Sequence, residues 1–367
     1  MTRASPGGHQ GVLRAPMDEE TPHDALLLVS FGGPEGREDV LPFLEGVTRG
    51  RGVPRERLLE VAAHYDHFGG VSPINAQNRA LLAAIRAELD AHGPRLPAYW
   101  GNRNWHPTLA DTVRQMAKDG RRRALAFVTS AYASYSACRQ YREDLAGAVA
   151  ATGSDAPAIE KLRLFYNHPG FVEAMVDTTQ AALAVLPPPE RAAAHLAFAA
   201  HSVPVAMAET SDYQAQLRES ATLVAERLAS RHPWQLVFQS RSGPPGVPWL
   251  EPDIGDHLAD LARRGAGAVV VVPIGFVADH LEVRYDLDTE AAAKAAALGL
   301  RFVRAGTAGT HPTFVSMVRE LCLERTAGAP PRALGTRGPA PDACGVDCCP
   351  LPARPPDGGP RQSGAER

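Results

Sequence analysis

Short apolar runs, bounded by glycine, proline and polar turns, alternate along this chain with longer stretches rich in alanine and leucine. The runs have the length of β-strands, and the longer stretches are typical of α-helices. Strands are predicted at 25–31, 97–101, 124–130, 162–166, 196–201, 235–240, 268–274 and 301–304. Helices are predicted at 40–48, 55–65, 74–91, 109–119, 138–151, 171–185, 212–230, 254–264, 282–298 and 312–325. Strict alternation of the two predicts parallel sheets covered on both faces.

A weak internal repeat runs through this pattern. Three pairs of segments at the ends of predicted strands correspond: 31–34 with 201–204, 100–103 with 238–241, and 128–132 with 272–276. Two doubly wound halves place all six turns at the carboxyl ends of parallel strands, where such folds bind ligands. We therefore predict an α/β fold of two similar Rossmann-like halves with a cleft between them.

The repeat and the change of texture near both ends predict five regions. They are a disordered N-terminal tail (1–22), an N-terminal α/β half (23–165), a C-terminal α/β half (166–309), a helix that packs back on the body (310–325), and a Pro/Gly-rich tail (326–367). The last region has almost no apolar periodicity, which is typical of disorder.

Composition excludes several classes of protein. With 367 residues the chain has ample surface to bury. A formal charge of −3 argues against a nucleic-acid partner. The longest apolar runs have strand length, far short of a bilayer span, so we expect no integral membrane segment. Residues 1–22 lack the apolar core of a signal sequence. We predict a soluble, cytoplasmic protein.

Cysteine usage is uneven. Of five cysteines, Cys344, Cys348 and Cys349 lie close together in the Pro/Gly-rich tail. This pattern does not resemble a secreted disulfide framework, and adjacent cysteines are poorly placed to bridge each other. Three clustered cysteines on such a segment favour a metal or iron–sulfur site that takes a fourth ligand from the body.

A row of carboxylates follows the predicted strand 268–274. On the predicted helix 282–298, Glu282, Asp286 and Glu290 stand four residues apart on one face, where they repel one another unless a cation lies among them. A solvated helix face is the alternative, and for most acidic runs it is the better one. Few basic residues are spaced to pair with the row, which favours a track for a cation into the cleft.

His201 follows the buried strand 196–201 and precedes a short turn closed by proline. At a strand carboxyl end its imidazole would point into the crevice, where it suits proton transfer or iron binding. The alternative is a turn histidine that caps backbone groups. His201 and Glu282 facing each other would form a mixed nitrogen and oxygen site, which suits Fe(II) better than magnesium or calcium.

Two further segments are candidates for ligand contact. Residues 69–74 form a loop that opens a helix, with Ser72 as the predicted N-cap and Pro73 at the first helical position. Such a helix start can also hold a carboxylate. The segment 132–142 is dense in hydroxyls, aromatic rings and arginine, and it fits the wall of a pocket for a flat, acidic ligand. Neither G-x-G-x-x-G nor a Walker motif is present, so the fold does not imply a dinucleotide.

Five segments together match the motifs of a known family. They are Phe-Gly-Gly-Pro at 31–34, Gly-Gly-Val-Ser-Pro-Ile at 69–74, Thr-Ser-Ala-Tyr at 129–132, His-Ser-Val-Pro at 201–204 and Asp-His-Leu-Glu at 279–282. From about residue 25 to residue 325 the sequence resembles the ferrochelatases. The resemblance implies a class II chelatase-like fold and insertion of ferrous iron into a porphyrin in haem biosynthesis, with release of two protons. The cysteine-bearing tail resembles coproporphyrin ferrochelatases of high-GC Gram-positive bacteria, which implies coproporphyrin III as substrate.

The resemblance also implies roles for individual residues. They are His201 and Glu282 for catalysis and iron, Asp286 and Glu290 for the metal path, and Ser72 and Tyr141 for the porphyrin. Tyr135 lies near enough to compete with Tyr141. At the position of Phe31 some bacterial relatives carry tyrosine, which can ligate the metal, whereas phenylalanine cannot. Whether His201 accepts protons or binds iron stays open.

A [2Fe-2S] cluster is implied as well. Its ligands would be Cys138, Cys344, Cys348 and Cys349. Cys322 lies at an apolar helical position and is predicted to be a core residue. Ferrous iron is a substrate, and product would pass to downstream enzymes of the haem pathway. The alternatives are a chelatase for cobalt or nickel, a protoporphyrin IX ferrochelatase, and a non-catalytic haem carrier or iron–sulfur sensor.

Overall fold

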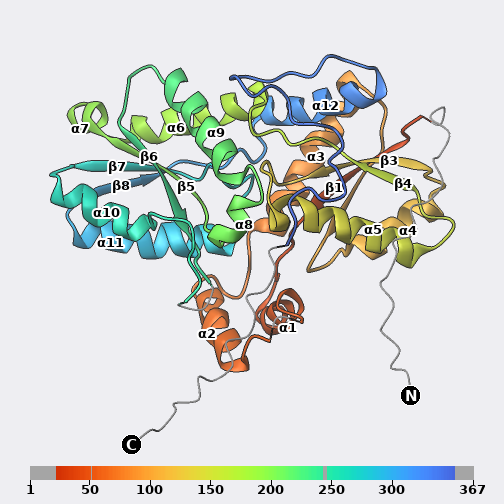
Figure 1. The fold of residues 1–367 in the computed structure, drawn as a ribbon, viewed down its shortest axis with the longest axis horizontal. Helices are drawn as coiled ribbons and strands as arrows, with labels where there is room; N and C mark the ends of the chain where they lie inside the picture. The colour runs from red at the N-terminus through yellow and green to blue at the C-terminus, as the bar shows by residue number, and fades with distance from the viewer. Residues whose placement is uncertain (1–21, 51, 243–245, 352–367) are drawn as a thin grey trace, which may run out of the picture.

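The protein contains two parallel four-stranded sheets with the same topology (Figure 1). The computed structural model describes residues 22–50, 52–242 and 246–351; the predicted N-terminal tail up to residue 21 and the end of the predicted C-terminal tail lie outside them. The first sheet has the order β2-β1-β3-β4 and the second the order β6-β5-β7-β8. The strands are β1 (Ala25–Ser30), β2 (Ala98–Asn102), β3 (Arg123–Val128), β4 (Ala158–Lys161), β5 (His195–His201), β6 (Trp234–Gln239), β7 (Ala268–Val272) and β8 (Arg301–Arg304).

Helices connect the strands and cover both sheets. In the first half they are α1 (Arg37–Val47), α2 (Arg55–Asp66), α3 (Ile74–His92), α4 (Leu109–Lys118), the π-helix η1 (Tyr135–Arg139) and α5 (Gln140–Thr152). Next come α6 (Pro169–Val185), α7 (Pro188–Ala193), α8 (Val205–Glu209), α9 (Tyr213–Arg227), α10 (Ile254–Arg263), the π-helix η2 (Val283–Ala291), α11 (Ala292–Ala297) and α12 (Pro312–Thr326). The predicted α/β fold of two parallel-sheet halves is confirmed. No helix among the described residues is long and apolar enough to cross a membrane.

One apolar core joins the two halves. Alternate residues of a strand face opposite sides of its sheet. Leu26 and Leu28 of β1 and Phe198 of β5 face a continuous core that also contains apolar residues of α3, α6, α9 and α12. The opposite faces are covered separately, by α4 and α5 in the first half and by α10, η2 and α11 in the second. Helices α3, α6, α9 and α12 therefore hold the two sheets together. They pack on the faces of the sheets and not across the carboxyl ends of the strands.

Most predicted elements are present, but one strand is misplaced. The strand predicted at 162–166 is wrong, because β4 is formed by Ala158–Lys161, which pairs with β3. β4 is an edge strand whose residues are all partly exposed and include two charges, so it carries no apolar signal. The apolar residues that follow are buried in the core without belonging to a sheet. The short helices α7 and α8 were not predicted.

Hydrogen bonds define how the two halves correspond. The Asn102 amide donates to the Pro107 carbonyl (2.7 Å), and the Phe238 amide donates to that of Pro252 (2.9 Å). Each proline is followed by a residue whose side chain caps the next helix, α4 or α10. Asn102 is therefore the counterpart of Phe238, two positions away from the alignment predicted from sequence. Arg103 and Gln239 take equivalent places after this correction.

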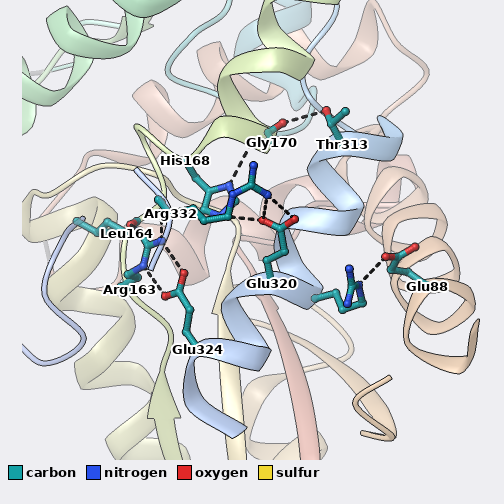
Figure 2. Close-up of polar contacts among 10 residues, drawn as sticks. Glu88, Arg163, Leu164, His168, Gly170, Thr313, Glu320, Glu324 and Arg332 are labelled. Atoms are coloured by element: carbon teal, nitrogen blue, oxygen red, sulfur yellow. Dashed lines mark hydrogen bonds and ion pairs between the residues drawn. The ribbon is translucent and has the colours of Figure 1, made fainter. Parts of the chain in front are cut away.

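Helices α6 and α12 pair reciprocally across the two halves. Each follows the fourth strand of its sheet and begins with His-Pro, and the cap rings of His168 and His311 each accept a backbone hydrogen bond. His168 Nε2 lies 3.3 Å from Glu320 of α12, and His311 Nε2 lies 3.2 Å from Asp177 of α6 (Figure 2 shows the first pair). Both acids stand eight residues after the proline of their helix. The two helices thus make the same contact in both directions.

The segment after α12 runs along the body without regular secondary structure. Arg332 pairs with Glu320 at 2.7 Å, and its carbonyl accepts a hydrogen bond from Arg163 (Figure 2). Further along, Arg337 pairs with Asp212 at 2.9 Å. Because Arg163 belongs to the segment after β4 and Asp212 precedes α9, this part of the tail is fastened to residues at widely separated places in the chain.

Candidate functional site

His201 and Glu282 meet at the carboxyl edge of the second sheet. His201 is the last residue of β5, and Glu282 directly precedes η2. His201 Nε2 lies 3.4 Å from a Glu282 carboxylate oxygen, and both side chains are partly open to solvent, at 35% and 52%. The other ring nitrogen, Nδ1, faces the Ser202 carbonyl. This contact directs Nε2 toward Glu282, so the pair can meet a proton or a metal ion.

Each of the two groups favours the charged form of the other. Burial acts to lower the pKa of His201, but the Glu282 carboxylate outweighs it and raises this pKa to about 8. Burial acts to raise the pKa of Glu282, but the His201 cation outweighs it, so the pKa of this carboxyl lies well below its usual value. Near neutral pH the pair is therefore an imidazolium and a carboxylate. Glu282 is ready to accept a proton, and His201 must first release one.

The acidic row continues on a π-helix, which the sequence did not predict. The predicted α-helix 282–298 is the π-helix η2 followed by α11. π-helical segments are rare and are frequent at functional sites. Burial, together with Glu282 and Glu290, raises the pKa of Asp286 to about 7, although Ser240 Oγ donates to its carboxylate. Glu290 is exposed. The three carboxylates thus follow one another along η2, with Asp286 the most buried and Glu282 and Glu290 exposed.

Asp279 and His280 hold the start of this row in place. Arg304 of β8 forms an ion pair with Asp279 (3.0 Å) and a second one with Asp288 in η2. His280 Nδ1 accepts a hydrogen bond from the Glu282 amide at 3.1 Å. A separate pocket is lined by Asp279, Arg304, residues of α3 and the segment 305–312, and none of the carboxylates of the row lines it. The motif at 279–282 therefore supplies the Glu282 carboxylate to the site, while Asp279 and His280 hold the segment in place.

Helices α1 and α2 of the first half reach the second half at this point. They lie apart from the two layers in Figure 1. The ring of Tyr285 in η2 stacks on His64 of α2 with 3.9 Å between centroids, and Leu281 is buried among apolar residues of α1 and α2. Burial and the Glu282 carboxylate raise the pKa of Tyr65. Sequence reasoning missed these neighbours because only tertiary packing brings them together.

Ser72 does not cap α3. The helix begins at Ile74, with Pro73 at the cap position and no side-chain capping bond, so the predicted N-cap is wrong. Ser72 is instead only 3% exposed. Its backbone amide donates to the Pro34 carbonyl at 2.9 Å, and its side chain packs directly against Gly33, where a Cβ would lie 2.7 Å from Ser72 Cβ. Ser72 therefore supports the turn after β1.

Tyr141 lies beneath Arg103. The Arg103 guanidinium stacks over the Tyr141 ring (4.4 Å) and lies 5.7 Å from the Phe31 ring, and it pairs with Asp144. Tyr141 is 5% exposed, and burial raises its pKa. Phe31 is more than a third exposed. The Phe31 ring is thus exposed on this side, whereas the Arg103 side chain is only 7% exposed.

The four predicted cluster cysteines gather at one place. Cys138 of η1 contacts Cys344, and the sulfurs of Cys348 and Cys349 lie 3.6 Å apart. Cys322 is fully buried in the core, as predicted. Within residues 22–50, 52–242 and 246–351, no three or more His, Cys, Asp or Glu side chains are arranged to hold a metal ion. The structure brings the thiols together without forming a complete ligand set.

Comparison with solved structures defines the class of fold. The structure of SirB from Bacillus subtilis with Fe3+ matches at a TM-score of 0.51 and 14% identity, covering 83% of this chain and 96% of that one. A Deinococcus radiodurans protein, DR2241, whose structure is described as similar to chelatases, matches at 0.51 and 15%, covering 83% and 56%. At these identities the likeness shows the fold, which is that of the class II chelatases.

Sequence comparison then shows the family. The ferrochelatase family model matches residues 23–326, so this chain belongs to the ferrochelatase family. The coproporphyrin III ferrochelatase of Streptomyces coelicolor is 56% identical, covering 91% of this chain and 95% of the relative. That of Frankia alni is 58% identical, covering 91% and 88%. A ferrochelatase of Rhodopirellula baltica is 53% identical, covering 94% and 99%.

Proposed function

We propose that this enzyme inserts ferrous iron into coproporphyrin III, giving Fe-coproporphyrin III and two protons. The observation that carries the proposal is the His201–Glu282 pair, 3.4 Å apart at the start of an acidic row. The choice of porphyrin is supported by relatives that are 56% and 58% identical over nine-tenths of the chain and are named for coproporphyrin III. Cytoplasmic location and transfer of product to later enzymes stay predictions.

Insertion exchanges two pyrrole protons for one Fe²⁺. In the proposed sequence the Glu282 carboxylate accepts one proton. His201 is protonated near neutral pH because of Glu282, so it must release that proton before it either accepts the second pyrrole proton or ligates iron. Both roles need a neutral imidazole. If His201 ligates iron, the Asp286 carboxylate, whose pKa is raised to about 7, would accept the second pyrrole proton. A cleft that bends the macrocycle would expose the pyrrole lone pairs, using binding energy from the rest of the ring.

Asp286 and Glu290 are proposed as the path by which iron enters. Asp286 is partly buried and lies between the exposed Glu290 and Glu282 in the row, so a cation moving along η2 would meet the three carboxylates in turn. The pKa of Asp286, raised to about 7, also lets this group carry protons in the opposite direction near neutral pH. Iron delivery and proton removal would then share one row of residues.

Ser72 and Tyr141 are the proposed porphyrin contacts with the least support from geometry. Both are nearly enclosed, at 3% and 5% exposed. A porphyrin would reach the Ser72 hydroxyl only if the turn around Gly33 moved, and Tyr141 only if Arg103 moved. Coproporphyrin carries four propionates, and Arg103 could pair with one only after leaving its ion pair with Asp144.

The four gathered cysteines are the proposed ligands of a [2Fe-2S] cluster. Thiolates are the usual ligands of such clusters, and the contact between Cys138 and Cys344 joins the body of the protein to its tail. The Arg139 and Arg142 guanidinium groups donate to the carbonyls of Cys348 and Cys344, each at 3.2 Å. These bonds hold the tail next to η1 and so keep Cys344 and Cys348 near Cys138. A bound cluster would supply one-electron redox chemistry or a crosslink.

The test is an anaerobic assay of Fe²⁺ insertion by the purified protein, with coproporphyrin III and protoporphyrin IX compared side by side by absorption. We expect Fe-coproporphyrin III as the main product and a loss of about 10²-fold or more in rate for His201→Ala and for Glu282→Gln. His311→Ala, which removes an ion-paired histidine elsewhere, is the matched control and should stay active. Formation of neither product refutes the proposal, and preference for protoporphyrin IX refutes the choice of substrate.

A further inference from the structure

Gln239 lies beside the candidate site, next to His201, and has no part in the proposed proton and iron steps. It is the last residue of β6 and pairs in register with His201 on β5. Its side chain is buried, at 1% exposed. The amide nitrogen Nε2 donates to the Glu282 carbonyl and to the Asp286 carboxylate, each at 3.3 Å. One neutral side chain therefore connects the end of β6 to the backbone of Glu282 and to the carboxylate of Asp286.

The environment fixes which way this amide points. Two oxygens, those of the Glu282 carbonyl and the Asp286 carboxylate, accept from Nε2. Exchanging the positions of the amide nitrogen and oxygen would place an acceptor next to these acceptors. The oxygen Oε1 is buried and has no hydrogen-bond partner among the described residues. The nitrogen Nε2 therefore faces the Glu282 carbonyl and the Asp286 carboxylate.

The next residue adds a second bond to the same carboxylate. Ser240 Oγ donates to Asp286. Its backbone has a φ of 61°, a left-handed conformation that non-glycine residues seldom adopt. Such conformations concentrate at functional sites, where the surroundings hold them. This turn places the hydroxyl on Asp286 immediately after Gln239.

We infer that Gln239 and Ser240 are positioning residues for iron insertion, which fasten the first turn of η2 to the end of β6 and so hold Asp286 next to the His201–Glu282 pair. The inference rests on the proposed function and deepens it, because it assigns these residues to the handling of iron and not to the porphyrin. Neither side chain is needed to form the sheet, whose strands pair through their backbones.

Substitutions separate this role from a structural one. Gln239→Met keeps the length of the side chain but removes both the donor and the unpaired oxygen. If Gln239 were only structural, this change would leave activity intact. We expect a KM for Fe²⁺ raised about tenfold, a KM for coproporphyrin III within about twofold of wild type, and an unchanged melting temperature. Gln239→Glu, which keeps an acceptor but loses the donor, should be impaired in the same way.

Ser240 is tested by two variants. Ser240→Ala removes the hydroxyl and keeps the side-chain constraint on the backbone, whereas Ser240→Gly removes the hydroxyl and suits the positive φ. Both should raise the KM for Fe²⁺. An effect of Ser240→Ala alone would assign the change to the backbone and overturn the assignment of Ser240. Gln115→Met is the matched control, because Gln115 donates to Asp119 (2.8 Å) on an exposed helix face.

Two results would overturn the inference: a KM for Fe²⁺ unchanged in Gln239→Met, or a parallel rise in both KM values. Either result requires that the wild-type enzyme inserts iron, so it leaves the proposed function standing. Failure of the wild-type protein to metallate coproporphyrin III or protoporphyrin IX refutes the proposed function itself. The two failures are therefore distinguished by the wild-type arm of the same assay.

Discussion

At the scale of single residues, the candidate site consists of side chains whose charges depend on one another. Glu282 keeps His201 protonated, and His201 keeps Glu282 ionised. Each group opposes the effect of burial on the other. Replacing either one therefore changes two functions together, the proton affinity of its partner and the number of groups that can meet iron.

The pH dependence of insertion should report His201. If the reaction needs neutral His201, the rate should rise with pH and level off above about 8, where this residue loses its proton. In Glu282→Gln, burial is no longer outweighed, so the pKa of His201 should fall and the rising limb should move to lower pH, at a rate reduced by about 10²-fold or more. The measurement is the pH profile of kcat in anaerobic assays. An unmoved limb would contradict this assignment.

The lowered pKa of His168 makes the free energy of unfolding depend on pH. Burial, with Arg163 and Arg332, lowers its pKa to about 3, whereas an unfolded chain binds the proton near 6.5. As the pH falls below about 6.5, His168 binds a proton in the unfolded state but stays neutral in the folded state. The free energy of unfolding should therefore decrease on acidification, with His168 contributing about 1.4 kcal/mol per pH unit.

Asparagine at position 168 tests this, because it also caps helices but does not titrate. Urea unfolding at pH 7, 6 and 5 should show a shallower loss of stability for His168→Asn than for wild type. His311→Asn replaces the corresponding cap of α12 and is the matched control for the loss of a histidine cap. Equal slopes for His168→Asn and wild type would show that this residue does not set the pH dependence.

Sequence reasoning worked for residues whose chemistry is visible in their type. His201 and Glu282 follow apolar strands, so their meeting at a sheet edge was predictable. Gln239 and Ser240 were missed because an amide and a hydroxyl at a strand end have no distinctive pattern. Ser72 was assigned a cap because serine before proline is a common helix start, but contact with Gly33 places it elsewhere.

At the scale of elements, apolar content decided which strands could be predicted. The central strands β1 and β7 are wholly buried, and their continuous apolar runs identified them. The edge strand β4 has no such run. The π-helical form of η2 could not be read from sequence, because the spacing of its acids also fits an α-helix.

The approach of α6 to α12 depends on Gly170. A Cβ at this position would lie 2.4 Å from the Thr313 carbonyl oxygen of α12. Gly170→Ala should therefore force the two helices apart and lower the free energy of unfolding by about 1–3 kcal/mol. Gly147→Ala in α5 is the matched control, since nothing lies within 4 Å of a Cβ there. The control should be neutral or slightly stabilising in urea unfolding, and equal effects of both changes would contradict the prediction.

At the scale of the whole molecule, the gathered cysteines predict a cluster that depends on the tail. Cys344→Ser should abolish the visible absorption of an iron–sulfur cluster and the stoichiometric iron and sulfide of the purified protein. Cys322→Ser, in the core, should keep them. Retention of a full cluster by Cys344→Ser would refute the ligand assignment, whatever the activity of that variant. A wild-type protein without iron and sulfide after anaerobic reconstitution would refute the cluster itself.

The reciprocal pairing of α6 and α12 also bears on the order in which the protein can be completed during synthesis. A ribosome produces the first sheet and α6 well before α12 and the tail, and domains tend to fold in that order. The contacts of His168 with Glu320 and of Cys138 with Cys344 can then form only after the later partner is made. Each contact closes a long stretch of chain, which is entropically unfavourable. A nascent chain released before residue 312 would hold both sheets but neither closing contact. Residues after 312 thus supply the contacts that close the earlier parts of the chain on each other.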